Sequence, residues 1–246
     1  MLLGKGLVAM TQDAAERVID YGGSGEAEDV LRWALGRFHP RIAIACSFQH
    51  TVLIDMAVRI QPQVRVFSID TGRLPEEMFE CARDIERHFK IKIEWYHPHN
   101  EPVEQMMRER GPYSFRESVD ERRRCCGIRK VEPLSRALSG LDAWITGVRR
   151  DQSSTRSAAG KIEIDAGHGG IVKINPLADW DYDAIRSYVV TRRLPYNRLF
   201  ERGYTSIGCA CCTRPVQPGD DPRSGRWWWE QSEHKECGLH VPNWNI

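Results

Sequence analysis

The sequence lacks a long apolar run, an excess of charge of either sign, and any internal repeat or low-complexity tract. A membrane-spanning helix needs about 18 consecutive apolar residues, and no segment approaches that length. The apolar part of the opening MLLGKGLVAM is also too short for a signal peptide. With 35 basic and 34 acidic residues the net charge is +1, so no overall field attracts nucleic acid. We therefore expect a cytoplasmic protein that binds neither membranes nor nucleic acid.

The apolar pattern predicts an α/β domain. From residue 41, near-continuous apolar segments alternate with helical patterns, as in a parallel sheet that is covered on both faces. The strand-like segments are RIAIACSF, VRVFSID, IKIEWYHP and LDAWITGV. A hairpin formed by KIEID and IVKINPL follows, and then a helix in DWDYDAIRSYVVTRR with Asp at its start. The sequence thus predicts a doubly wound, mostly parallel sheet.

Three regions are expected. Residues 1–40 form a helical preamble, with helix-like stretches at 14–21 and 26–38. Residues 41–195 form the nucleotide-binding α/β domain. Residues 196–246 are rich in glycine, proline and cysteine and lose periodicity, so this segment needs something other than a core to order it.

Polar residues follow three of the predicted strands. Ser47 follows the first, Asp70-Thr71-Gly72 the second, and Arg149-Arg150-Asp151 the fourth. Ligands of doubly wound sheets bind beyond the carboxyl ends of the strands. We expect these residues to share one crevice.

The eight cysteines indicate a metal or redox centre rather than disulfides, because no secretory signal is recognisable. Cys209 and Cys212 form a CxxC pair, whose spacing lets two thiolates reach one metal centre. Cys125 and Cys126 are adjacent, which suits a cluster with several iron atoms better than a single zinc ion. A cysteine-rich zinc site remains an alternative. Cys211 is a spare thiol, and we interpret Cys46 and Cys81 as core residues.

Basic residues surround the adjacent cysteines, where they would offset the negative charge of a thiolate-bound cluster. The alternative for each of them is a solvated helix face. They are Arg122, Arg123, Arg124, Arg129 and Lys130.

The C-terminal segment carries a candidate nucleophile. Cys237 lies between Lys235 and His240, and nearby cations favour the nucleophilic thiolate. Upstream, Arg223 and Arg226 suit bidentate binding of phosphate or sulfate oxygens. The three tryptophans that follow them at 227–229 are interpreted as packing residues.

These motifs resemble those of a known family. CysCys, CxxC and ECGLH, in that order on a chain with IDTGRLPEE and TGVRRDQSSTR, are similar to the assimilatory sulfonucleotide reductases, most closely to those that use adenosine 5′-phosphosulfate (APS). The resemblance runs from about residue 41 to residue 240. It implies an adenine nucleotide α-hydrolase-like fold and the activity of an adenylyl-sulfate reductase that uses thioredoxin.

The resemblance also implies roles for individual residues. One 4Fe–4S cluster would bind to Cys125, Cys126, Cys209 and Cys212. Cys237 would attack the sulfur of the phosphosulfate and form an S-sulfocysteine, and thioredoxin would then release sulfite. The substrate-binding residues would be Lys130, Arg223, Arg226, His240 and, less directly, Arg156 and Ser47. Lys130 would connect the cluster to the substrate.

One departure and three alternatives stay open. Family members usually have a longer loop, often with a glycine, after the first strand, whereas this chain has CSFQH. We therefore expect Ser47, Phe48 and Gln49 to contact the nucleotide differently here. The alternatives are a reductase of the 3′-phosphorylated nucleotide, an ATP pyrophosphatase of similar fold, and a zinc-stabilised nucleotide-binding module. The oligomeric state, including a homo-oligomer, is also open.

Overall fold

A six-stranded, mostly parallel sheet forms the centre of the computed structural model, which describes residues 25–231. The strands run in the order β3-β2-β1-β4-β6-β5, and only β5 is antiparallel to its neighbour. Their bounds are β1 Ile42–Ala45, β2 Arg65–Ile69, β3 Ile93–Tyr96, β4 Ala143–Ile145, β5 Ile162–Asp165 and β6 Ile171–Ile174. The predicted doubly wound α/β fold, with its β5–β6 hairpin, is confirmed.

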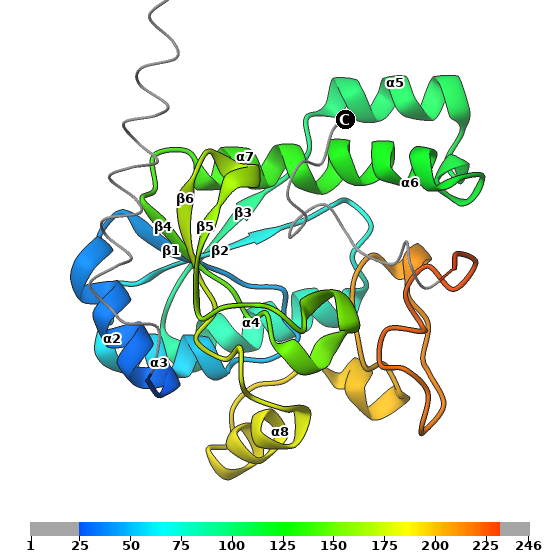
Figure 1. Cartoon of the computed structure of the whole chain (residues 1–246). Helices are drawn as coiled ribbons and strands as arrows, with labels where there is room; N and C mark the ends of the chain where they lie inside the picture. Colours follow the sequence, from blue (N-terminus) through cyan, green and yellow to red (C-terminus); the bar gives the residue numbers. More distant parts are fainter. Residues whose placement is uncertain (1–24, 232–246) are drawn as a thin grey trace, which may run out of the picture.

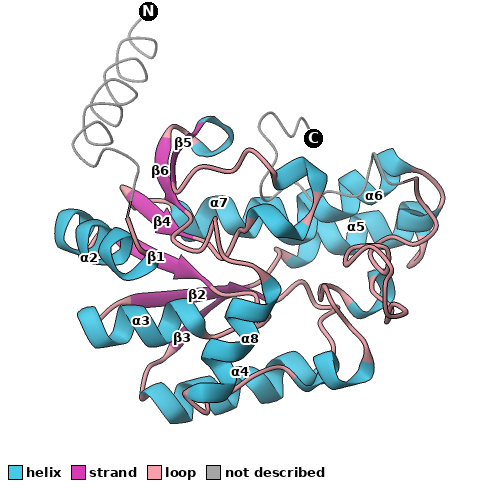
Figure 2. Ribbon diagram, turned by 60° about the horizontal axis from the view of Figure 1, so that its bottom comes forward, coloured by secondary structure: helices cyan, strands magenta, loops and turns pink. Residues whose placement is uncertain are grey.

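Helices cover both faces of the sheet. Their bounds are α2 Ala27–Phe38, α3 Val52–Ile60, α4 Glu76–Phe89, α5 Asn100–Arg110, α6 Val119–Cys126, α7 Glu132–Leu138 and α8 Tyr182–Thr191. Helices α2, α3, α4 and α8 lie on one side of the sheet and α7 lies on the other (Figures 1 and 2). Within residues 25–231, no helix is both long and apolar enough to cross a membrane.

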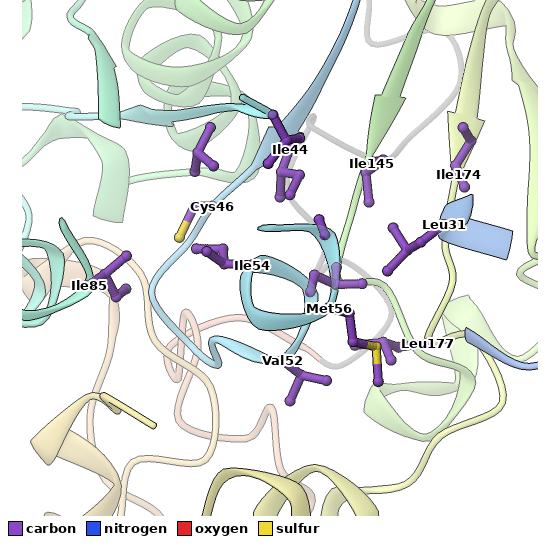
Figure 3. Close-up of a cluster of buried hydrophobic side chains, with 14 of the residues drawn as sticks. Leu31, Ile44, Cys46, Val52, Ile54, Met56, Ile85, Ile145, Ile174 and Leu177 are labelled. Atoms are coloured by element: carbon purple, nitrogen blue, oxygen red, sulfur yellow. The ribbon is translucent and has the colours of Figure 1, made fainter. Parts of the chain in front are cut away.

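The alternation of side chains along the strands divides the core into two layers. Ile42 and Ile44 of β1 point to the α3 side, whereas Ala43 between them packs with Leu134 of α7 on the opposite face. Figure 3 shows the larger layer, in which the side chains of α3 meet those of the central strands. The near-continuous apolar strands are therefore explained by burial on both faces.

Two capping residues fix the helices nearest the site. The Ser118 side chain accepts a hydrogen bond from the backbone N–H of Glu121 at the start of α6. Asp181 accepts one from Ala184 at the start of α8, which confirms the predicted Asp at the start of that helix. Helix α6 therefore begins at a defined point, two turns before the adjacent cysteines.

The predicted domain boundaries at residues 40 and 195 stay predictions. Helix α2, which belongs to the predicted preamble, packs into the same core as the sheet through Leu31. Leu199 and Ile207, beyond the second boundary, belong to that core as well. The predicted helix at 14–21 and the tail from residue 232 lie outside the described residues.

Candidate active site

A cavity of about 390 Å³ opens where the strand order reverses, between β1 and β4. Ser47 follows β1, Thr71 follows β2 and Arg149 follows β4, and all three line the cavity. This is the position at which doubly wound sheets bind nucleotides. The expected crevice at the strand ends is present.

The loop after β1 has an unusual backbone conformation. Phe48 adopts a left-handed backbone with φ of 55°, a region that favours glycine, and its side chain is buried. Its ring stacks on Trp95 with 5.5 Å between the ring centroids. Next to it, Ser47 lines the cavity and accepts a hydrogen bond from the Gln49 amide at 3.3 Å. Packing by an aromatic side chain thus holds a turn in which glycine is the usual residue.

The loop after β4 contributes a neutralised arginine. The side chain of Arg149 is buried and donates two hydrogen bonds to Asp151, at 2.9 and 3.2 Å. His50 packs against Gly147. A Cβ added to this glycine would come within 2.9 Å of the imidazole Nε2. Burial, together with the charge of Arg149, lowers the pKa of His50 to about 4. The imidazole is therefore neutral at pH 7.

Replacing His50 with glutamine should make stability less sensitive to acid. The pKa of His50 is lower in the folded chain than in the unfolded chain, where it is about 6.5, so the unfolded chain binds the extra proton first. Stability is then full above pH 6.5 and falls as the pH drops toward 4. We expect the wild type to lose roughly 1–2 kcal/mol more than the variant between pH 7.5 and pH 5. Urea unfolding at both pH values measures this difference, and equal losses would contradict the lowered pKa.

The C-terminal segment supplies two cations to the same cavity. Arg223 and Arg226 are buried and line it together with Arg156, which donates a hydrogen bond to Gln152 at 2.5 Å. The buried Nε of Arg226 has no hydrogen-bond partner within residues 25–231. A buried donor of this kind is normally satisfied.

A second, smaller cavity lies beside the first and gathers the predicted cysteines. Cys125 and Cys126 border it from the end of α6, and Cys209 and Cys212 border it from the CxxC loop. The Thr71 hydroxyl lies 3.3 Å from the Cys209 sulfur. In the part of the chain that the structure describes, no three His, Cys, Asp or Glu side chains are placed to hold a single metal ion. All four predicted cysteines thus border one common space, and Cys211 borders it as well.

The surroundings of this cavity suit a bound anion. Two buried donors that border it, Nε of Arg129 and Nε1 of Trp227, have no hydrogen-bond partner in the described part of the chain. Burial raises the pKa of Cys125, and the charges of Arg73, Arg129 and Lys130 act in the opposite direction. A cluster held by four thiolates carries net negative charge and accepts hydrogen bonds at its sulfurs. The donor set therefore fits such a group.

Lys130 connects the two cavities. After Cys126 the helix widens into a π-helical turn, Gly127–Val131, before α7 begins. Such turns are rare and often occur at functional sites. The turn buries Lys130, which lines both the large cavity and the cysteine cavity. This is the position that we expected of a residue linking the two.

Only some of the basic residues that we expected around the cysteines lie there. Arg122 and Arg129, like Lys130, border the cysteine cavity. Arg124 instead pairs with Glu109 at 2.6 Å on the surface, and Arg123 lies 3.8 Å from Asp120. For these two the alternative of a solvated helix face holds, because adjacent side chains on a helix point in different directions.

One cation at the cysteines was missed from the sequence. Arg73 borders the cysteine cavity and donates a hydrogen bond to the spare thiol of Cys211 at 3.8 Å. A hydrogen bond with Cys212, together with the charge of Arg73, lowers the pKa of Cys211. The signal was present in the motif IDTGR, where Arg73 directly follows the strand-end residues. Cys237 and His240, in contrast, lie outside the described residues.

A comparison with known protein families shows which family the chain belongs to. The family described as "Phosphoadenosine phosphosulfate reductase domain" matches residues 40–215, which include the whole sheet and all four motif cysteines. The chain belongs to this reductase family. The resemblance found from CysCys, CxxC and ECGLH is thereby confirmed, and with it the expected fold.

Individual relatives of the reductase family agree with this result. The chain is 46% identical over 198 residues to "Adenosine 5′-phosphosulfate reductase" of Allochromatium vinosum, covering 80% of this chain and 77% of the relative. It is 40% identical to the protein of the same name from Burkholderia cepacia, covering 95% and 91%. Among solved structures it is similar to the phosphoadenylyl-sulfate reductase of Candida auris in its phosphate complex. That likeness has a TM-score of 0.66, 29% identity, and coverage of 80% of this chain and 93% of the other.

Proposed function

We propose that this protein reduces APS to sulfite and AMP in sulfate assimilation in the cytoplasm. The observation that carries the proposal is the junction of two sites. A cavity at the β1–β4 switch, lined by Arg223, Arg226 and Lys130, adjoins a cavity that the four motif cysteines border together with Cys211. Membership of the reductase family and relatives named for APS support the same reaction. The loop after β1 carries Phe48 rather than a run of glycines, which argues against an ATP pyrophosphatase.

The reaction proceeds by covalent catalysis on Cys237. Its thiolate attacks the sulfur of the phosphosulfate, a bond forms between the two sulfur atoms, and the bond from that sulfur to the phosphate oxygen breaks. AMP leaves with the electron pair, and the enzyme carries an S-sulfocysteine. One thiolate of a dithiol such as thioredoxin then attacks Cys237 Sγ, sulfite leaves, and a mixed disulfide forms. The second thiol of the reductant attacks this bond, which closes the reductant's own disulfide and releases the Cys237 thiolate. The dithiol thus supplies the two electrons that reduce the sulfur.

The basic residues bind and stabilise the anion. Arg223 and Arg226 are buried, and their planar guanidinium groups are suited to binding phosphate or sulfate oxygens. Lys130 adds a point charge from the π-helical turn, and Arg156 adds a third guanidinium from the loop after β4. As AMP departs, negative charge grows on the phosphate, and fixed cations in a water-poor cavity stabilise that charge most. His240 and Ser47 complete the proposed binding set.

The four cysteines Cys125, Cys126, Cys209 and Cys212 would hold one 4Fe–4S cluster. When bound, it would supply a compact negative charge and join the end of α6 to the CxxC loop. Arg129 and Trp227, whose buried Nε and Nε1 donors have no partner within residues 25–231, border this space and could donate hydrogen bonds to such a group. Lys130 lines both cavities, so the charge of the cluster would attract its ammonium group while that group also reaches the substrate cavity. No electron needs to pass through this group in the proposed reaction.

Measuring turnover with APS and with the 3′-phosphorylated nucleotide tests which of the two is the substrate. The relatives in bacteria are named for APS, whereas the family description and the Candida auris structure name the 3′-phosphorylated nucleotide. With thioredoxin as reductant, we expect kcat/KM for APS to exceed that for the 3′-phosphorylated nucleotide by at least about 100-fold, the scale of a site that excludes one charged group. A preference for the 3′-phosphorylated nucleotide would overturn the proposal. A colourless zinc protein that forms no sulfite with either would indicate a binding module instead.

A further inference from the structure

Arg226 is fixed by the loop that carries the CxxC cysteines. Its side chain, only 5% exposed, donates from Nη1 toward the Ser206 hydroxyl at 3.4 Å and the Ile207 carbonyl at 3.3 Å. Cys209 follows two residues later in the same loop. One short stretch of backbone therefore binds the guanidinium of Arg226, which lines the large cavity, and also carries Cys209, which borders the cysteine cavity.

Gly208 leaves the space that Arg226 occupies. A Cβ at this position would come within 2.3 Å of Arg226 Nη2 and 2.7 Å of its Cζ, distances at which something has to move. Gly208 is not among the glycines with positive φ, so its backbone is open to other residues. The requirement for glycine here comes from the arginine and not from the turn.

Trp227 holds Arg226 from a second direction. The buried ring lies 4.6 Å from the guanidinium carbon of Arg226 and 4.6 Å from that of Arg122. Arg122 belongs to α6, which carries Cys125 and Cys126, and it pairs with Glu230 at 2.6 Å. The backbone N–H of Trp227 donates to the Cys212 carbonyl at 3.1 Å. Helix α6 and the CxxC loop, which carry the four cysteines, therefore both contact Trp227, the residue against which Arg226 packs.

We propose that Gly208 and Trp227 are positioning residues that hold Arg226 in the anion site and tie its place to the cysteine loop, residues 206–212. This inference rests on the proposed role of Arg226 in binding the phosphosulfate. It gives the cysteine site a second connection to the substrate, independent of Lys130. Movement of the loop displaces both hydrogen-bond acceptors of Arg226 Nη1 at once.

A double-mutant cycle between Gly208 and Arg226 tests the proposal. APS binding is measured by calorimetry on the anaerobically purified holoenzyme, in a Cys237→Ser background so that no adduct forms. We expect Gly208→Ala to weaken binding about 10- to 100-fold, or about 1.4–2.7 kcal/mol. Arg226→Lys should also weaken it. The double variant should bind within about twofold of Arg226→Lys alone, because lysine lacks the guanidinium atoms that the new Cβ would meet.

Controls separate positioning from general damage. Gly36→Ala adds a Cβ with nothing within 4 Å and should leave APS binding and iron content unchanged. If Gly208→Ala does not fold, the same cycle is run with Trp227→Leu, for which we expect about 10-fold weaker binding and rescue by Trp227→Phe, which keeps an aromatic face.

The outcomes distinguish this inference from the proposed function. If the Cys237→Ser protein does not bind APS, the proposed function fails. If it binds APS but the effects at Gly208 or Trp227 simply add to that of Arg226→Lys, the function stands and the positioning role is wrong. Wild-type affinity in both Gly208→Ala and Trp227→Leu would also overturn it.

Discussion

Replacing Cys237 with serine should lower the rate of sulfite release from APS by at least about 10⁴-fold, the scale seen when an enzyme loses its nucleophile. A serine hydroxyl is almost never ionised at pH 7, whereas a thiol ionises far more readily, and the cations Lys235 and His240 lie close by in the sequence. The affinity for APS should change by less than about threefold, because the oxygen occupies nearly the same volume and the cations that bind the anion are untouched. Steady-state assays with thioredoxin and calorimetric binding measure the two quantities.

Cys81 provides the matched control for this variant. It is buried in the core, and burial raises its pKa to about 12, so it supplies no thiolate at neutral pH. Cys81→Ala should retain turnover near that of the wild type once the protein is folded. Residual activity above a few per cent in Cys237→Ser would contradict the assignment of the nucleophile.

Replacing Cys209 with serine should remove the iron and the broad visible absorption of the anaerobically purified protein. The wild type should contain about four iron and four sulfide per chain, since four thiolates hold one such cluster. A serine at 209 removes one ligand and also the sulfur that lies 3.3 Å from the Thr71 hydroxyl. The variant should also bind APS more weakly, because the loop that fixes Arg226 loses its anchor. Elemental analysis and absorption spectra give the first result.

Cys211→Ser is the control for this loss. Cys211 sits between two proposed ligands, is half-buried and contacts Arg73 and Cys212, yet both CxxC positions are already occupied by its neighbours. It should keep its iron and its colour. Equal loss in both variants would show that the ligand set is wrong, and a zinc content of one per chain would favour the zinc alternative.

The sheet could be predicted from the sequence because its strands are buried on both faces. Segments such as RIAIACSF have an apolar residue at nearly every position, a pattern that a surface strand does not show. The polar residues that end these strands, Ser47 and Arg149 among them, then had to meet at one edge. The place of the cavity therefore follows from strand order alone.

The contacts that position the side chains of the site could not be predicted from the sequence, because they join residues far apart in the chain. Arg122 meets Glu230, and Arg129 donates to the Thr71 carbonyl at 2.7 Å. Nothing in the local pattern of 127–131 indicates a π-helical turn, since one extra residue per turn leaves no clear periodic signal. Phe48 in a left-handed backbone is likewise a tertiary effect, held by the ring of Trp95.

Intact mass measurement tests the central claim most directly. The anaerobically purified protein is incubated with APS and no reductant, and its mass is compared with that of Cys237→Ser treated in the same way. The account predicts that the wild type gains the mass of one sulfonate group, that thioredoxin removes it, and that the variant gains nothing. A wild type that turns over APS without ever showing this adduct, or a variant that still carries it, would contradict the covalent role of Cys237.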